Sequence, residues 1–122
     1  MKSIMKILFS DSLEKINEYE NKLRIQTTTT NSDTANESPL NHIYEVTAYS
    51  FIEYLFDRYP FMPEDHLVDF GCGKGRVMIM AAEYGCLNIT GYEINKERFI
   101  LLKKTLITIV RKIAKPALIF II

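Results

Sequence analysis

The chain has 122 residues, which suffices for one domain, and 48% of them are hydrophobic, enough to form a core. Its formal net charge is zero, which excludes a protein that is strongly basic or acidic overall. The apolar run near the N-terminus is short, and basic residues and Pro116 interrupt the apolar C-terminal stretch, so we expect no signal peptide, no membrane span and a cytoplasmic location.

Residues 11–24 are predicted to form a helix that Asp11 or Ser12 caps, because apolar side chains follow at helical spacing. Residues 26–38 are polar and low in complexity, so we expect a linker or long loop there. Residues 1–43 are therefore predicted to be a loosely attached helix and linker, and residues 44–122 a second unit.

Residues 45–58 are predicted to form a second helix, which Tyr59-Pro60 ends. Its apolar stripe consists of Tyr49, Ile52, Leu55 and Phe56. Two interpretations of Tyr44 and Tyr49 stay open: they cover a ligand site, or they belong to the core.

The most informative stretch runs from Leu67 to Arg76, Leu-Val-Asp-Phe-Gly-Cys-Gly-Lys-Gly-Arg. A short apolar run, three alternating glycines and a helical pattern indicate a buried strand, a tight turn and a helix start. The free N–H groups of that helix favour a small anionic or polar ligand in the turn. The stretch does not match the dinucleotide-binding motif, because Arg76 takes the place of its third glycine. It does not match the P-loop motif either, because Gly75 offers no hydroxyl for magnesium.

The chain then continues as a β-α-β-α-β unit. A helix is predicted from Lys74 to about residue 84, with Gly85 as its C-cap, followed by a strand over residues 89–92. Asn95 is predicted to cap the next helix, and residues 117–122 can form a third buried strand after Pro116. We expect an α/β fold with three parallel strands in the order 3-2-1, flanking helices, and N-terminal helices before them.

The acidic residues at the ends of the first two strands strengthen this interpretation. Asp69 precedes the glycines, and Glu93 ends the second strand about 20 residues later, where nucleotide-binding units place a ribose-binding carboxylate. With the glycines, this pattern resembles the first motifs of class I S-adenosylmethionine (SAM)-dependent methyltransferases, which have a Rossmann-like fold. The resemblance covers about residues 44–105, and the chain looks truncated after the third strand.

The resemblance implies a role for each matching residue, with SAM as the cofactor. The backbone of the turn would lie against the methionine portion, Asp69 would bind near its amino group, and Glu93 would bind both ribose hydroxyls. Ile94 would pack on the adenine side. The implied cofactor-binding set is Asp69, Phe70, Gly71, Cys72, Gly73, Gly75, Glu93 and Ile94. No catalytic residue is implied, because methyl transfer depends mainly on positioning.

Several alternatives stay open. The chain could be a methyltransferase, a non-catalytic SAM-binding module, or an NAD-dependent oxidoreductase, which Arg76 disfavours. The methyl acceptor is not specified by any segment. The basic residues of 96–122 could bind an anionic partner, but without interleaved aromatic residues a solvated helix face is favoured.

Two further expectations concern cysteines and self-association. Cys72 and Cys86 lack metal-ligand spacing and His42 and His66 are isolated, so we expect free thiols in a reducing cytosol and no metal. The first strand would be an exposed apolar edge, so we expect either self-association through that strand or a poorly stable chain.

Overall fold

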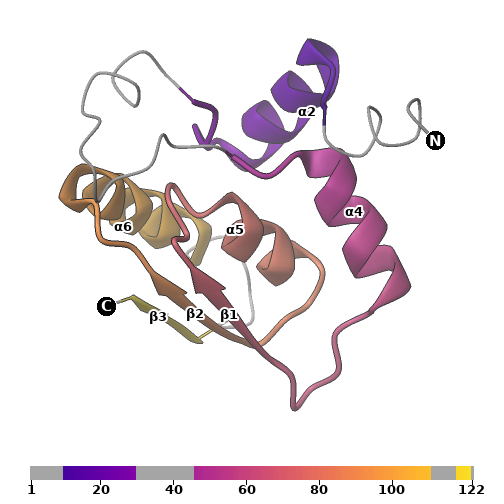
Figure 1. The fold of residues 1–122 in the computed structure, drawn as a ribbon, viewed down its shortest axis with the longest axis vertical. Coiled ribbons are helices and arrows are strands. Elements are labelled where there is room, and N and C mark those ends of the chain that lie inside the picture. Colours follow the sequence, from indigo (N-terminus) through magenta and orange to yellow (C-terminus); the bar gives the residue numbers. More distant parts are fainter. Residues whose placement is uncertain (1–9, 30–45, 111–117, 122) are drawn as a thin grey trace.

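The computed structural model describes residues 10–29, 46–110 and 118–121 (Figure 1). These residues form helices and strands that alternate along the second part of the chain. In chain order the elements are α2 (Leu13–Leu23), α4 (Tyr49–Arg58), β1 (His66–Phe70), α5 (Arg76–Glu83), β2 (Asn88–Tyr92), α6 (Lys96–Val110) and β3 (Leu118–Ile121). The predicted α/β class is confirmed.

The described strands form one parallel sheet in the order β1-β2-β3, which is the predicted order 3-2-1 seen from the other edge. β1 pairs with β2 so that Leu67 lies opposite Ile89 and Asp69 opposite Gly91. β2 pairs with β3 so that Ile89 lies opposite Ile119. Because the strands are parallel, the carboxyl ends of β1 and β2 meet at the same end of the sheet.

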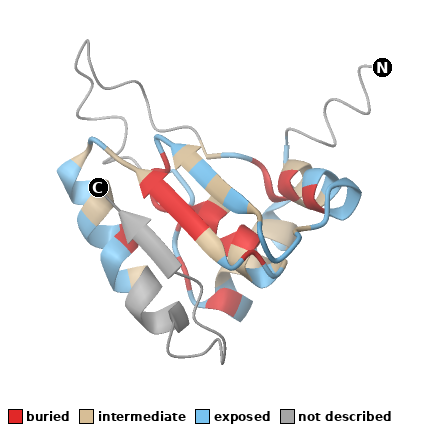
Figure 2. Ribbon diagram, turned by 90° about the horizontal axis from the view of Figure 1, so that it is seen from below, coloured by how far each residue is buried: buried red, intermediate tan, exposed pale blue. Residues whose placement is uncertain are grey.

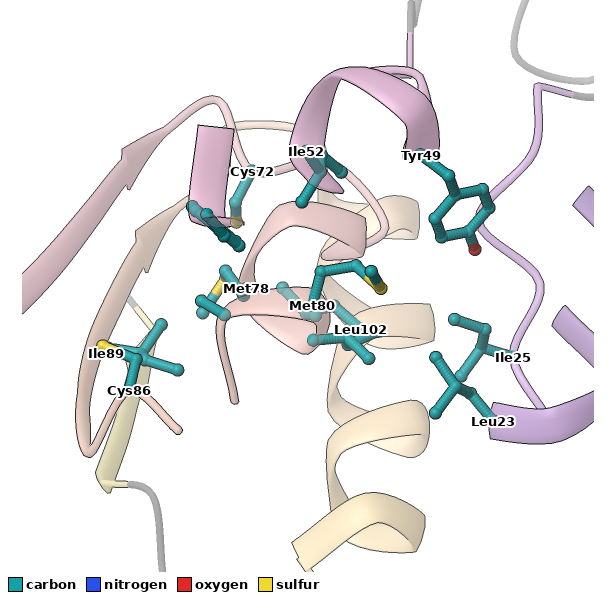
Figure 3. Packing of buried hydrophobic residues seen from close by; sticks show 13 residues of the cluster. Leu23, Ile25, Tyr49, Ile52, Cys72, Met78, Met80, Cys86, Ile89 and Leu102 are labelled. Carbon is teal, nitrogen blue, oxygen red and sulfur yellow. The ribbon is translucent and has the colours of Figure 1, made fainter. Parts of the chain in front are cut away.

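One face of the sheet is covered by helices and carries the core (Figure 3). Ile89 of β2 packs in one cluster with Met78 and Ile79 of α5 and with Leu102 of α6. On β1, His66, Val68 and Phe70 are exposed, whereas Leu67 and Asp69 are partly buried. Figure 2 shows such an alternation as pale blue and tan bands along a strand. Side chains alternate along a strand, so the exposed set lies on the face away from this core.

The N-terminal segment belongs to the same core, so the prediction that it is loosely attached is wrong. Leu23 and Ile25 lie in the cluster that contains Ile52 and Met80. Thr27, in the run predicted to be a linker, is completely buried. Apolar contacts and buried polar groups hold this segment, and its polar composition gave no sign of them. Residues 30–38 and the predicted boundary between residues 43 and 44 lie outside the described residues.

Tyr49 and Leu55 correct the predicted stripe of the second helix. Tyr49 is fully buried and stacks on Tyr19 of α2 with ring centroids 4.5 Å apart, so for Tyr49 the core interpretation holds. Tyr44 lies outside the described residues. Leu55 is 37% exposed, because α5 and α2 contact the side of α4 that carries Ile52 and Phe56.

Helix starts also differ from the prediction, for local reasons. Ser12 caps α2, since its Oγ accepts a hydrogen bond from the backbone N–H of Lys15 at 3.1 Å. α4 begins at Tyr49 rather than residue 45, because Ala48 is extended. α5 begins at Arg76 rather than Lys74, because Gly75 is left-handed with φ of 87°. Asn95 caps α6 as predicted.

Candidate functional site at the carboxyl ends of the strands

The glycine turn, residues 71–75, folds back against the end of β2. The backbone N–H groups of Gly71 and Cys72 donate to the carbonyl oxygen of Tyr92, at 2.7 and 3.0 Å. The N–H of Gly75 donates to the carbonyl oxygen of Cys72 at 2.8 Å, which closes the turn. Gly71, Gly73 and Gly75 all have positive φ, which other residues adopt only with strain. The sequence of the turn therefore specifies its backbone.

Glu93 joins the glycine turn to the start of α6. Its Oε2 accepts the N–H of Gly73 at 2.7 Å, and its Oε1 accepts the N–H of Asn95 at 2.7 Å. The Oδ1 of Asn95 then accepts the N–H of Arg98 at 3.0 Å, which caps the helix. The predicted site residues Gly73 and Glu93 are thus in direct contact, although they lie on different elements.

Asp69 and Glu93 come close enough to interact electrostatically. Burial raises the pKa of Asp69 from 3.8 to about 6, and the charge of Glu93 contributes in the same direction. Burial, with the nearby charges of Asp69 and Glu93, raises the pKa of Cys72 to about 12. The Cys72 thiol is therefore neutral at physiological pH, which makes it unsuited to nucleophilic attack.

Phe70 and Ile94 are also at the strand ends, but their side chains are largely exposed. Phe70 is 80% exposed and Ile94 is 82% exposed. The ring of Phe70 stacks on that of Tyr92 at 5.1 Å, on the face of the sheet opposite to Asp69. Phe70 can therefore contribute to the Asp69 side through its backbone, whereas Ile94 offers an apolar side chain to a ligand.

Two buried basic residues, Lys74 in the turn and Arg76 directly after it, are not among the predicted site residues. Lys74 is 5% exposed and Arg76 is 2% exposed, and both bind the N-terminal segment. The sequence held one signal for Arg76: it lies one helical turn before Met80, on the buried side of α5. Their partners lie more than 25 residues away in sequence, so no local pattern could identify them.

A cavity of about 1010 Å³ lies beside the turn, between α2 and α6. It is lined by residues that include Glu20, Arg24, Thr28, Lys74, Asn95 and Arg98. Two of the lining residues adjoin the candidate site: Lys74 belongs to the glycine turn, and Asn95 follows Glu93 by two residues. None of the predicted cofactor-binding residues lines it, so the cavity borders the candidate site without containing it.

Metal and membrane features are not found in the described part of the chain. No group of three or more His, Cys, Asp or Glu side chains within it could hold a metal ion. None of its helices is both long and apolar enough to cross a membrane. Cys72 and Cys86 are buried free thiols, and the imidazole Nε2 of His66 forms a hydrogen bond with Thr90 Oγ1 at 2.7 Å.

The fold and these contacts together define an α/β protein with a candidate ligand site where parallel strands end, between a glycine turn and two carboxylates. A family model described as histone methylation protein DOT1 matches residues 13–114. The chain therefore belongs to this family of methyltransferases. No individual curated protein that was compared with the chain matches it.

Proposed function

We propose that the chain binds SAM and contributes the cofactor-binding part of a SAM-dependent methyltransferase with a Rossmann-like sheet. One observation carries the proposal: Glu93 and Asp69 interact at the ends of adjacent parallel strands, and Glu93 Oε2 lies 2.7 Å from the backbone nitrogen of Gly73. Membership of a methyltransferase family supports the same reaction class.

The chemistry of SAM fits the residues present. Each oxygen of Glu93 accepts one backbone N–H and retains a lone pair, so the carboxylate can also accept the two ribose hydroxyls. The partly buried Asp69 carboxylate suits the ammonium of the methionine portion. The exposed Ile94 side chain suits the adenine ring. Bound SAM would supply an activated methyl group, and the protein would hold it in line with an acceptor.

The acceptor is a separate question. The family's description names histone methylation, and protein is one of the acceptor classes that the sequence leaves open. We assign no catalytic residue.

The buried free thiols Cys72 and Cys86 support our proposal of a reducing, cytoplasmic location.

Calorimetry with SAM and with its demethylated product tests the cofactor site. Glu93→Gln should weaken binding about tenfold, because a charge-assisted hydrogen bond to a ribose hydroxyl is worth about 1.4 kcal/mol more than a neutral one. Glu83→Gln is the matched control, since Glu83 is an exposed acid on α5. Absence of wild-type binding at millimolar SAM, or full affinity in Glu93→Gln, would refute the proposal.

Assays of methyl transfer and of NADH binding distinguish the remaining candidate functions. Transfer of a radiolabelled methyl group to histone or another protein would identify an enzyme. Binding without transfer to protein, nucleic acid or small-molecule acceptors would identify a non-catalytic SAM-binding module. Saturable NADH fluorescence without a response to SAM would instead indicate an oxidoreductase.

A further inference from the structure

Residues 25–28, here called the N-terminal strap, are hydrogen-bonded directly to the glycine turn. Lys74 lies between Gly73 and Gly75, and its Nζ donates a hydrogen bond to the carbonyl oxygen of Thr28 at 3.0 Å. The lysine is 5% exposed, whereas Thr28 is exposed, so this contact is partly buried. A buried ammonium group needs such partners, because an unpaired charge inside a protein is costly.

Arg76, immediately after the turn, makes a larger set of contacts with the same strap. Its Nε donates to Thr27 Oγ1 at 2.7 Å, and its Nη2 donates to Thr28 Oγ1 at 3.2 Å. Its Nη1 donates to the carbonyl oxygen of Thr47 at 3.1 Å, just before α4. The guanidinium also lies 4.0 Å from the ring centroid of Tyr49. This fixed, planar set of donors could not be reproduced by lysine.

Glu20 of α2 holds the strap through hydrogen bonds. One carboxylate oxygen, Oε1, accepts the backbone N–H groups of Thr27 and Thr28 at 3.0 and 3.1 Å. The same oxygen accepts the Thr28 hydroxyl at 2.8 Å and lies 3.5 Å from Arg76 Nη2. A continuous series of polar contacts therefore runs from α2 through the strap to the start of α5.

The glycine turn is thus held on three sides. Tyr92 and Glu93 hold it on the β2 side, and the side chain of Leu102 packs against Gly75 on the α6 side. The strap holds it on the third side through Lys74 and Arg76. A turn that is ordered before binding saves the entropy that a flexible turn would lose when the ligand binds.

We propose that the N-terminal strap is a positioning element for the glycine turn, with Thr27 and Arg76 as positioning residues. This inference rests on the proposed function, because the ligand that benefits from the ordered turn is SAM. Thr27 is completely buried, and none of the residues assigned to contact the cofactor lies in the strap. The strap therefore acts on binding through the turn.

Hydrogen exchange and calorimetry on the whole chain test the strap. Thr27→Val removes the acceptor of Arg76 Nε while conserving shape, and we expect faster exchange of the amides of residues 71–75 without cofactor and about fivefold weaker binding of SAM. Thr27→Ser, which retains the hydroxyl, should restore both. Lys74→Met should act in the same direction as Thr27→Val, because it removes the bond to Thr28.

Lys15→Met is the matched control. It breaks the ion pair between Lys15 Nζ and Glu53 Oε2, 2.5 Å apart, which joins α2 to α4 away from the turn. It should lower the melting temperature while leaving exchange in the turn and SAM affinity unchanged, at a temperature where all variants are folded.

Two results would overturn the proposal: wild-type exchange of residues 71–75 in both Thr27→Val and Lys74→Met, or equal acceleration in Lys15→Met. If wild-type protein binds no SAM, the proposed function fails, whereas the exchange measurements still decide whether the strap orders the turn.

Discussion

The protonation of the Asp69 carboxyl makes the stability of the protein depend on pH. Its pKa is raised from 3.8 to about 6, first by burial and then by the charge of Glu93. Folding therefore favours the protonated form of this carboxyl relative to the unfolded chain. The stabilising contribution is fully present below pH 3.8 and is lost as the pH rises through about 6.

We expect Asp69→Asn to be more stable than the wild type at pH 7.5, because it removes the cost of a partly buried charge beside Glu93. The difference in free energy of unfolding should shrink as the pH falls from 7.5 to 4. Urea denaturation at several pH values measures it, with Glu83→Gln as a control at an exposed acid. A difference that stays constant with pH would contradict the assigned shift.

The raised pKa of Asp69 also predicts how the binding of SAM depends on pH. SAM carries an ammonium group that favours the ionised carboxylate, so the affinity of the wild type for SAM should fall as the pH drops below about 6. In Asp69→Asn this part of the pH dependence should disappear.

At the scale of elements, contacts across the chain decide how the helices begin. Asp11 was one of two candidate caps for α2, but its carboxylate accepts the N–H groups of Tyr49 and Ser50 at 2.7 and 2.9 Å and so caps α4. Asp11 Oδ2 also lies 3.9 Å from Arg76 Nη1, at the start of α5. One buried acid therefore fixes the relative positions of α2, α4 and α5.

The junction of the glycine turn with α5 allows a matched test of packing. Gly75 and Gly85 both have positive φ, 87° and 91°. A Cβ added at Gly75 would lie 2.3 Å from Leu102 Cδ1, whereas one added at Gly85 would meet nothing within 4 Å. Gly85→Ala should therefore cost only the backbone strain, about 1–2 kcal/mol.

We expect Gly75→Ala to destabilise the protein by about 1–3 kcal/mol more than Gly85→Ala, because the buried Leu102 must move. Urea denaturation gives both values. Combining Gly75→Ala with Leu102→Ala should relieve the overlap, so the double variant should be more stable than the sum of the single effects predicts. Strict additivity would show that the two sites do not touch.

At the scale of the whole molecule, β1 is paired on one side only among the described strands, and β2 is its neighbour. Val68 is 44% exposed and Phe70 80% exposed on the same strand. An apolar strand with unpaired backbone groups tends to pair with another chain. We propose self-association of the protein through this edge.

Size-exclusion chromatography with light scattering should find the wild type larger than a monomer, and Val68→Lys should shift it toward the monomer, because charge on an edge strand opposes pairing. Leu13→Lys is the control, since Leu13 is a 73% exposed apolar residue on α2, far from β1 in the sequence. A monomeric wild type, or an equal shift in Leu13→Lys, would exclude the edge as the interface.

Short-range patterns were sufficient for much of the fold. Alternating glycines, Asn95 as a cap and the apolar runs of the first two strands act within a few residues, so the turn, the start of α6 and the parallel strands could be predicted. The position of Glu93 at the end of β2 followed from the same local pattern. Whether these residues bind SAM stays a prediction.

The position of the N-terminal segment depended on interactions between residues far apart in the chain. Lys74 and Arg76 bind Thr28 and Thr27, and Asp11 caps a helix that begins 38 residues later. A polar run such as residues 26–28 has the composition of a loop. Thr27 alone is buried in it, because its hydroxyl oxygen accepts a hydrogen bond from the buried Arg76. Burial and the pairing of buried charges arise only when distant segments pack, so only the tertiary structure could decide them.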